Sequence, residues 1–332
     1  MLNVNKPKVF LQKPLPQDIQ AYLDKHVDIK IWDKPDALTR EQLLKEIADV
    51  DGLLTSGTAI NEELLEQAPQ LRVVSSISVG YNHFDTKAMK EYGVIGTHTP
   101  YVLDDTVSDL VISLMLSAAR RVPELDAMTK RGEWEKGIGE SMFGVDVHHK
   151  KLGIIGMGRI GETIAKRAKY GFDMDVTYFN RSRKKEIEEK LNINYQLMDD
   201  LLRESDFIVL MVPLSNETKQ LIGSREFQLM KSSTIFINAS RGQTVNEQAM
   251  IEALQTGEIL AAGLDVYEQE PINEDNPLLK MDNVVTLPHI GSATSETRHT
   301  MAMLAAKNLV AALTGEGSFY AVKELQGVKV RQ

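Results

Sequence analysis

Short runs rich in β-branched and aliphatic residues alternate with charged, helix-compatible segments over the first hundred residues of the chain. This alternation is typical of parallel strands joined by helices, and it predicts a small α/β domain. The expected strands are residues 9–11, 27–32, 52–55, 71–76 and 94–97, and the clearest helical segments between them are residues 40–50 and 60–67.

A long amphipathic helix is expected to begin where this alternation stops. Apolar residues repeat at helical spacing over residues 107–118, behind Asp104 and Asp105, and two arginines follow them. Acidic residues at the start of a helix and basic residues at its end complement the helix dipole. Pro123 can begin a further helical stretch. Residues 131–146 show no clear period and are interpreted as a connector to a second domain.

The second half of the chain repeats the strand and helix alternation with longer helices. Six expected strands in such an alternation indicate a doubly wound parallel sheet. The strands are residues 152–155, 176–179, 207–212, 234–237, 260–266 and 284–287, and the clearest helices are residues 160–170, 183–191 and 248–255.

A second long helical pattern, through residues 301–312, follows Gly291 and leaves this sheet. We expect it to return the chain to the first domain. The predicted fold is therefore α/β, with two Rossmann-like or flavodoxin-like domains. Residues 104–290 form a doubly wound domain inserted into a discontinuous domain of residues 1–103 and 291–332.

Length and charge agree with this organisation. A chain of 332 residues exceeds the roughly 250 to 300 residues at which single cores stop growing, so two domains are expected. With 38 basic and 47 acidic residues, the formal charge of −9 disfavours a broad cationic surface for nucleic acid or anionic lipid. An anionic ligand would need a local basic site.

Two absences in the sequence narrow the chemistry. The chain has no cysteine, which excludes disulfides, thiolate metal sites and cysteine nucleophiles, and fits a reducing, cytoplasmic setting. The histidines show no metal-ligand spacing, so we predict no metal site. The N-terminus lacks the features of a secretory signal, and the most apolar segment, residues 110–119, is too short to span a bilayer. We therefore expect no membrane association.

Residues 156–161 read Gly-Met-Gly-Arg-Ile-Gly, between an expected strand and an expected helix. In a G-x-G-x-x-G sequence the first glycine permits a tight turn, the second lets backbone approach a pyrophosphate, and the third lets helix and strand pack closely. A structural glycine turn is the simpler alternative. The strand before, the helix after and a second strand roughly twenty residues on favour dinucleotide binding.

The end of that second strand bears on the choice of dinucleotide. An NAD site needs an acidic residue there, but residues 178–185 read Tyr-Phe-Asn-Arg-Ser-Arg-Lys-Lys, and Asp175 lies at the start of the strand instead. Residues Asn180, Arg181, Ser182 and Arg183 are candidates to hold the 2′-phosphate of NADP. We favour NADP over NAD. The alternative is that these basic residues only form a solvated start to the next helix.

Three further motifs lie at expected strand ends, where parallel sheets bind ligands. They are Asn-Ala-Ser-Arg-Gly at 238–242, Gly-Leu-Asp-Val-Tyr-Glu-Gln-Glu-Pro at 263–271, and Pro-His-Ile-Gly-Ser-Ala-Thr at 288–294. With these motifs the chain resembles the D-isomer-specific 2-hydroxyacid dehydrogenase family over almost its whole length. Residues 146–150 and 180–183 resemble the NADPH-preferring glyoxylate, hydroxypyruvate and 2-ketogluconate reductases of that family.

The resemblance implies a role for each candidate. Arg241 would bind the substrate carboxylate and its carbonyl oxygen, and the backbone N–H groups of Val79 and Gly80 would hold the other carboxylate oxygen. His289 would protonate the carbonyl oxygen, Glu270 would orient the imidazole, and the bound nicotinamide would supply the hydride. Glu268 competes with Glu270 for this role, but the family spacing selects Glu270.

The resemblance and the motifs together give a set of residues expected at the cofactor. Taken singly, each has a structural alternative such as a turn, a solvated loop acid or a packing histidine. Asp265 is expected near the nicotinamide end. The full set is Thr106, Gly156, Gly158, Arg159, Ile160, Gly161, Asn180, Arg181, Ser182, Arg183, Val212, Pro213, Thr218, Ala239, Ser240, Arg241, Asp265, His289, Gly291 and Ser292.

Residues 1–103 and 291–332 would thus be the substrate-binding domain and residues 104–290 the NAD(P)-binding domain. The expected function is NADPH-dependent reduction of glyoxylate to glycolate, of hydroxypyruvate to D-glycerate and of 2-ketogluconate to gluconate. Family members are commonly homodimers, and we expect the same here. Two alternatives stay open at this point: an NAD-dependent dehydrogenase of the phosphoglycerate or lactate type, and a dinucleotide-sensing interaction protein without turnover. One departure is Asn82-His83, where many relatives have Asp-Asn.

Overall fold

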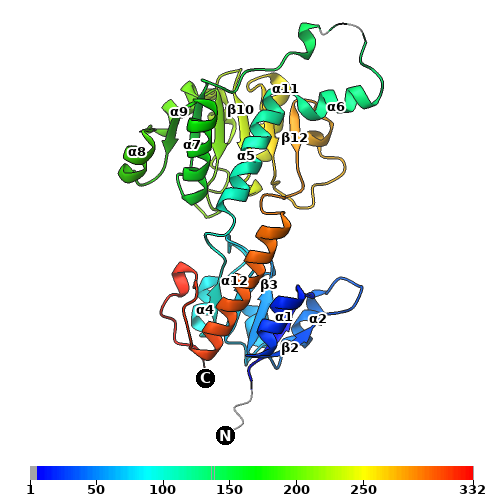
Figure 1. Cartoon of the computed structure of the whole chain (residues 1–332), viewed down its shortest axis with the longest axis vertical. Coiled ribbons are helices and arrows are strands. Elements are labelled where there is room, and N and C mark those ends of the chain that lie inside the picture. The colour runs from blue at the N-terminus through cyan, green and yellow to red at the C-terminus, as the bar shows by residue number, and fades with distance from the viewer. Residues whose placement is uncertain (1–5, 136, 138, 332) are drawn as a thin grey trace. The chain divides into compact units, whose positions relative to one another are not determined.

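The computed structural model describes residues 6–135, 137 and 139–331 of the chain (Figure 1). The chain divides into two compact units. One comprises Met1–Leu103 with Thr294–Gln332, and the other comprises Asp104–Ala293. Each unit contains one sheet of parallel strands covered by helices. The expected fold class, two α/β units with parallel sheets, is confirmed.

The first unit has a five-stranded sheet in the order β2-β1-β3-β4-β5. After β1 the chain moves to one side for β2 and then returns to the other side for β3, so the direction of winding reverses between β1 and β3. The helix α12 packs on this sheet and beside α1: Ser75 Oγ donates to the carbonyl oxygen of Ala305 at 2.8 Å, and His299 Nε2 lies 2.8 Å from Asp18 Oδ2. The elements are β1 (Lys8–Leu11), α1 (Gln17–Asp24), β2 (Asp28–Ile31), α2 (Arg40–Glu46), β3 (Gly52–Thr55), α3 (Glu62–Gln67), β4 (Val73–Ser76), α4 (Thr86–Glu91), β5 (Ile95–Thr97), α12 (Ser295–Thr314) and the 3₁₀ turn Lys323–Leu325.

The second unit has a seven-stranded parallel sheet in the order β12-β11-β10-β9-β6-β7-β8. Winding reverses between β6 and β9, which is the order of a Rossmann fold with one added strand. The elements are α5 (Asp104–Ala119), α6 (Val122–Lys130), β6 (Lys151–Ile155), α7 (Arg159–Phe172), β7 (Asp175–Phe179), α8 (Lys185–Leu191), β8 (Asn194–Tyr195), α9 (Met198–Glu204), β9 (Phe207–Leu210), α10 (Ser224–Leu229), β10 (Ile235–Asn238), α11 (Glu247–Thr256), β11 (Ala261–Leu264), β12 (Val284–Thr286) and 3₁₀ turns at Glu140–Met142, Gly242–Thr244 and Pro277–Lys280.

The helices α5 and α7 lie against each other in this unit (Figure 1). Arg167 on α7 binds Asp109 through Nε at 2.7 Å and Asp105 through Nη2 at 3.0 Å. Arg159, in the first turn of α7, donates to Asp104 Oδ2 at 3.0 Å. Acidic residues in the first half of α5 therefore form ion pairs with arginines of α7, and those in its first turn also complement the dipole of α5.

One aspartate fastens the amino edge of each sheet. Asp51 Oδ2 accepts the backbone N–H of Lys8 at 2.8 Å, and Asp206 Oδ2 accepts that of Lys151 at 2.9 Å. In both cases the acid precedes one strand and satisfies the first amide of its neighbour, an amide that otherwise would have no ladder partner. The opposite, carboxyl edges are left to the loops that carry the candidate functional residues.

The strands lie within two residues of their expected bounds, and three differences are notable. The strand expected over residues 207–212 ends at Leu210, so Val212 lies in the loop that follows it. The two-residue strand β8 was not expected, because so short a segment shows no periodicity. The strand expected over residues 260–266 pairs only over Ala261–Leu264; the next residues leave the ladder and enter the candidate site. Among the described residues, the helices are too short or too polar to serve as membrane spans.

Candidate active site

The glycine loop after β6 is held by packing at two of its three glycines. Gly156 has φ +108°, and a Cβ there would collide with the carbonyl oxygen of Met211. A Cβ at Gly161 would collide with the carbonyl oxygen of Gly156. The first and third glycines of the fingerprint are therefore required by the turn and by the contact between helix and strand.

Gly158, the middle glycine, has no such packing reason. It caps α7 in an extended conformation with φ −90°, and a Cβ at this position would meet no atom within 4 Å in the described part of the chain. Because Gly158 has no side chain, the backbone at the N-terminus of this 14-residue helix is accessible. Such a surface suits the pyrophosphate of a dinucleotide, which needs close backbone approach and free N–H donors.

The loop after β7 contains the residues expected to select the dinucleotide. Arg183 is committed to Glu188, with Nε 2.8 Å from Oε1 and Nη2 2.7 Å from Oε2. Arg181 is exposed and has no hydrogen bond or ion pair with any described residue. Asn180 Nδ2 donates to the carbonyl oxygen of Ser182 at 3.0 Å. Asp175 begins β7 and so lies at the opposite edge of the sheet. Of the two arginines, Arg181 is the one available to a phosphate.

The loop after β9 is shaped by a threonine hydroxyl. Thr218 Oγ1 donates to the carbonyl oxygen of Pro213 at 2.6 Å and accepts the backbone N–H of Ser215 at 2.7 Å. Val212 lies against Gly156, since a Cβ on that glycine would be 2.9 Å from Val212 Cγ1. The loop after β9 therefore borders the glycine loop after β6, at the point where winding reverses.

Arg241 is presented by a compact turn after β10. Asn238 Oδ1 accepts the hydroxyl of Ser240 at 2.8 Å, and the carbonyl oxygen of Arg241 accepts the hydroxyl of Thr244 at 2.6 Å. Nη1 of Arg241 donates to the carbonyl oxygen of Ser240 at 2.6 Å. Burial lowers the pKa of the Arg241 guanidinium, against the opposing charge of Glu270. A partly buried cation of this kind favours an anionic ligand.

Gly242 brings this turn into direct contact with the loop after β11. A Cβ at Gly242 would collide with the backbone of Tyr267. Gln243 Nε2 donates to the carbonyl oxygen of Glu268 at 2.7 Å and fastens the same two loops. Gln243 was not expected at the site, and Gly242 was expected only as the last residue of the motif at 238–242. The Arg-Gly pair marked the turn, but the partner of Gly242 is distant in sequence.

Glu270 and His289 form a hydrogen-bonded pair. His289 Nδ1 lies 2.6 Å from Glu270 Oε2, and Glu270 Oε1 accepts the backbone N–H of Tyr267 at 3.1 Å. Burial raises the pKa of Glu270, but these two hydrogen bonds outweigh it, so its pKa lies below the ordinary value and the group is ionised at neutral pH. The other ring nitrogen, Nε2, is left for a ligand. Glu268, the competing acid, is exposed as Glu270 is, but its backbone N–H donates to Glu247 at 3.0 Å and no bond from its side chain to His289 is present among the described residues.

Asp265 fixes the backbone on which His289 stands. Its two carboxylate oxygens accept the N–H groups of Ile290 and Gly291 at 2.7 and 2.8 Å. His289 itself has φ +52°, a left-handed conformation that favours glycine and is held here by its neighbours. Burial raises the pKa of Asp265, which these N–H donors oppose. The expected contact with nicotinamide stays a prediction; what the structure adds is that Asp265 orients the histidine loop.

The remaining cofactor candidates lie on the same elements. Thr106 is in the first turn of α5, Ile160 is in the first turn of α7, Ala239 is in the turn after β10, and Ser292 follows the histidine loop. The structure places them in the second unit with the loops described above.

Val79 and Gly80 belong to the first unit, in the loop after β4. Ser78 Oγ donates to the carbonyl oxygen of Gly80 at 2.8 Å, and His98 Nδ1 lies 2.9 Å from the carbonyl oxygen of Val79. Both carbonyls are thus engaged, whereas the backbone N–H groups of Val79 and Gly80 donate to no described residue. The loop therefore leaves two adjacent donors for a carboxylate oxygen.

The comparisons with known proteins bear on the second unit first. The family model for the NAD-binding domain of D-isomer-specific 2-hydroxyacid dehydrogenases matches residues 112–291, more than half of the chain. The chain belongs to the D-isomer-specific 2-hydroxyacid dehydrogenase family. The matched segment contains every strand of the seven-stranded sheet, so the second unit of this dehydrogenase is an NAD(P)-binding domain.

Relatives of this dehydrogenase match it over nearly its full length. It is 50% identical over 310 residues to glyoxylate/hydroxypyruvate reductase B of Klebsiella pneumoniae, covering 93% of this chain and 96% of the relative. It is also 50% identical over 311 residues to glyoxylate/hydroxypyruvate reductase B of Escherichia coli K12, covering 94% and 96%. The structure of an NADPH-dependent glyoxylate/hydroxypyruvate reductase from Sinorhizobium meliloti, in complex with NADP and malonate, matches with a TM-score of 0.85 at 28% identity, covering 99% of both chains. The family resemblance expected from the sequence is confirmed.

The different environments of Gly156 and Gly158 yield a matched pair of variants. We expect Gly158→Ala to leave the melting temperature nearly unchanged but to weaken dinucleotide binding by at least about tenfold, because the new methyl group occupies the approach to the backbone. We expect Gly156→Ala to lower the melting temperature by several degrees through its positive φ and its collision with Met211. Calorimetric titration and thermal unfolding measure the two effects. Normal affinity in Gly158→Ala would show that the pyrophosphate does not approach this glycine.

Proposed function

We propose that this dehydrogenase uses NADPH to reduce glyoxylate to glycolate and hydroxypyruvate to D-glycerate, and that it also reduces 2-ketogluconate to gluconate. The observation that carries the proposal is the Glu270–His289 pair, with its free ring nitrogen, beside the partly buried Arg241 in an NAD(P)-binding domain. The 50% identity to two proteins named glyoxylate/hydroxypyruvate reductase B supports this choice of substrates.

The proposed chemistry uses residues on the loops after β10, β11 and β12. Arg241 binds the substrate carboxylate and the oxygen of its ketone through the guanidinium fork. A bound nicotinamide supplies the hydride to the carbonyl carbon. His289 gives the proton on Nε2 to the carbonyl oxygen, and the ionised Glu270 stabilises the charged imidazole before this transfer. The products would be the 2-hydroxy acid, the oxidised dinucleotide and a neutral imidazole, which regains its proton from water.

The choice of NADPH is supported by the loop after β7. This loop carries an unpaired arginine and no acid at the position where an NAD site needs one. Arg181 would contribute a charge-assisted hydrogen bond to the 2′-phosphate. The structural relative from Sinorhizobium meliloti is NADPH-dependent and was solved with NADP, which agrees with this proposal.

We further propose a homodimer that works on free metabolites in the cytoplasm, without nucleic acid or metal. Large apolar side chains are exposed on α6 and on the connector that follows it, including Val122, Trp134 and Phe143, which are 51%, 62% and 61% exposed. Exposed apolar side chains concentrated on one segment are typical of a subunit interface. The net charge and the lack of cysteine support the rest.

The proposed reaction is tested by following nicotinamide absorbance with glyoxylate and hydroxypyruvate. We expect both acids to be reduced, with kcat/KM higher for NADPH than for NADH, because only NADPH offers the 2′-phosphate to Arg181. A preference for NADH would contradict the cofactor proposal alone. Absence of turnover with either cofactor and any 2-keto acid would contradict the enzyme and favour a dinucleotide-sensing protein.

Arg181 and Arg183 provide a matched test of the cofactor proposal. We expect Arg181→Ala to raise the KM for NADPH by about tenfold while the KM for NADH changes little, because one charge-assisted bond to the phosphate is lost. Arg183→Ala is the control, since that arginine is already committed to Glu188. If only Arg183→Ala separates the two cofactors, the phosphate is bound by Arg183 instead.

The pair at the reacting centre predicts how two substitutions differ. We expect His289→Ala to lower kcat by about 10² or more, because the proton donor is lost. Glu270→Gln keeps the shape but removes a charge that the folded protein holds ionised at neutral pH. We expect a smaller loss of kcat than in His289→Ala, and we expect the variant to lack the fall in activity that protonation of Glu270 causes in the wild type as the pH drops below the ordinary carboxyl range. Steady-state rates across pH measure both. Unchanged NADPH affinity is the control, and wild-type kcat in His289→Ala would assign the proton transfer to another group.

A further inference from the structure

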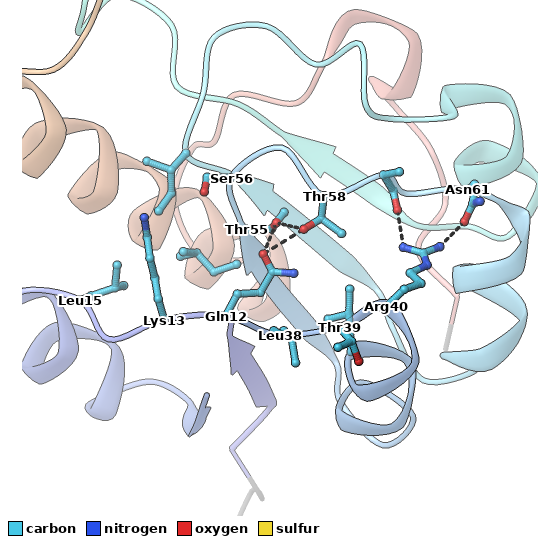
Figure 2. A pocket seen from close by; sticks show the side chains of 14 residues that line it. Gln12, Lys13, Leu15, Leu38, Thr39, Arg40, Thr55, Ser56, Thr58 and Asn61 are labelled. Atoms are coloured by element: carbon cyan, nitrogen blue, oxygen red, sulfur yellow. Dashed lines mark hydrogen bonds between the residues drawn. The ribbon is translucent and has the colours of Figure 1, made fainter. Parts of the chain in front are cut away.

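One cavity of the first unit is lined by none of the candidate catalytic or cofactor residues (Figure 2). It is a cavity of about 530 Å³ at the carboxyl ends of β1 and β3, between these strand ends and α2. Winding of the sheet reverses between β1 and β3. The carboxyl edge at such a reversal is where open parallel sheets bind ligands. The volume is typical of sites for small organic molecules and far exceeds the need of a two-carbon acid.

The polar groups of this cavity are arranged as donors. Gln12 Oε1 accepts the hydroxyls of Thr55 at 2.7 Å and of Thr58 at 2.9 Å, as the dashed lines in Figure 2 show. These bonds fix the orientation of the carboxamide and leave its NH₂ group unused. Neither Lys13 Nζ nor Ser56 Oγ has a hydrogen-bond partner among the described residues. An ammonium, an amide NH₂ and a hydroxyl are therefore available together.

The charged side chains that line the cavity are basic. Among the described residues, no aspartate or glutamate lines the cavity, although the chain contains 47 of them. Arg40, the second cation of the lining, is occupied by the carbonyl oxygen of Ala59 at 2.8 Å and by Asn61 and Glu63. Leu15, Leu38 and other apolar side chains complete the walls. A ligand rich in oxygen acceptors, with CH groups along its chain, matches both kinds of surface.

The cavity also adjoins the loop expected to hold the substrate carboxylate. Ile77, the residue directly after β4, lines the cavity, and Val79 follows two residues later. Because consecutive Cα atoms are about 3.8 Å apart, the Cα of Val79 lies within roughly 8 Å of that of Ile77. A 2-keto acid held at Val79 and Gly80 has its far end within reach of the cavity if its chain is long, and not if it is glyoxylate.

We propose that Lys13, Gln12 and Ser56 form a specificity subsite for the hydroxylated far end of elongated 2-keto acids, the class to which 2-ketogluconate belongs. Lys13 and the Gln12 amide donate to successive hydroxyl oxygens, and Ser56 both donates and accepts. The inference rests on the proposed function, because it takes the reacting end of the molecule to be bound as described above. The subsite would determine which length and polarity of substrate the enzyme prefers.

The subsite is tested with Lys13→Met, which keeps the length and apolar stem of the side chain but removes its donors. Steady-state constants are measured with NADPH for glyoxylate, 2-ketogluconate and 2-ketoglutarate. We expect the KM for 2-ketogluconate to rise about tenfold, the loss typical of a hydrogen bond to a charged donor, while kcat and KM for glyoxylate stay at wild-type values. Ser56→Ala should give a smaller change in the same direction. Lys45→Met, on α2 but outside the lining and paired with Glu41, is the matched control and should change neither substrate.

Measurements with glyoxylate distinguish a failure of the proposed function from a failure of the subsite. If the wild type does not reduce glyoxylate, the proposed function fails before the subsite is tested. If the wild type reduces both acids and Lys13→Met leaves the KM for 2-ketogluconate unchanged, or raises it equally for glyoxylate, the subsite is wrong. A loss confined to 2-ketoglutarate would show that Lys13 binds a terminal carboxylate, which also contradicts a hydroxyl subsite.

Discussion

The parallel register of β10, β11 and β12 is the constraint on which the candidate active site depends. Asn238 at the end of β10 pairs with Leu264 at the end of β11, and Leu264 pairs with Thr286 at the end of β12. Neighbouring strands lie about 4.8 Å apart, so three chain segments leave the sheet side by side at one edge. Arg241, Glu270 and His289 are carried by these three segments. Their convergence follows from the ladder and is then refined by the close contact at Gly242 and by the clamp of Asp265.

Bringing these charged groups together removes water from around them, which disfavours their ionised forms. Specific hydrogen-bond and charge partners at the site oppose this effect. Asp265 is almost fully buried and accepts two backbone N–H groups, which oppose the rise of its pKa caused by burial. Glu270 is held ionised by His289 and by the N–H of Tyr267. Burial lowers the pKa of Arg241, and the nearby charge of Glu270 opposes this change. A partly buried guanidinium beside ionised carboxylates that have their own donors suits a small anionic ligand.

The carboxyl edge of the sheet in the first unit also carries groups that can bind a ligand, as is typical of parallel sheets. Its strand ends carry a loop with two unused backbone donors at Val79 and Gly80, and beside it a cavity in which Lys13 and Gln12 keep unused donors of their own. Both features lie at the carboxyl edge, while Asp51 fastens the amino edge. A sheet that collects donors at one edge suits a ligand with several oxygen atoms.

Much of this protein was determined by the sequence alone, because the signals concerned are local. Hydrophobic periodicity marked most strands of both sheets, and residues 156–161 marked the dinucleotide loop, since the steric demands of a tight turn act between near neighbours. The family motifs named the candidate groups. The family spacing had also favoured Glu270 over Glu268 as the partner of His289, and the structure pairs these two side chains. Only the tertiary structure decided which two amides Asp265 accepts and that Arg183 is committed to Glu188. The cavity of Lys13 was not expected at all, because its walls come from β1, β3 and α2, and no periodicity relates segments that meet only when the sheet has formed.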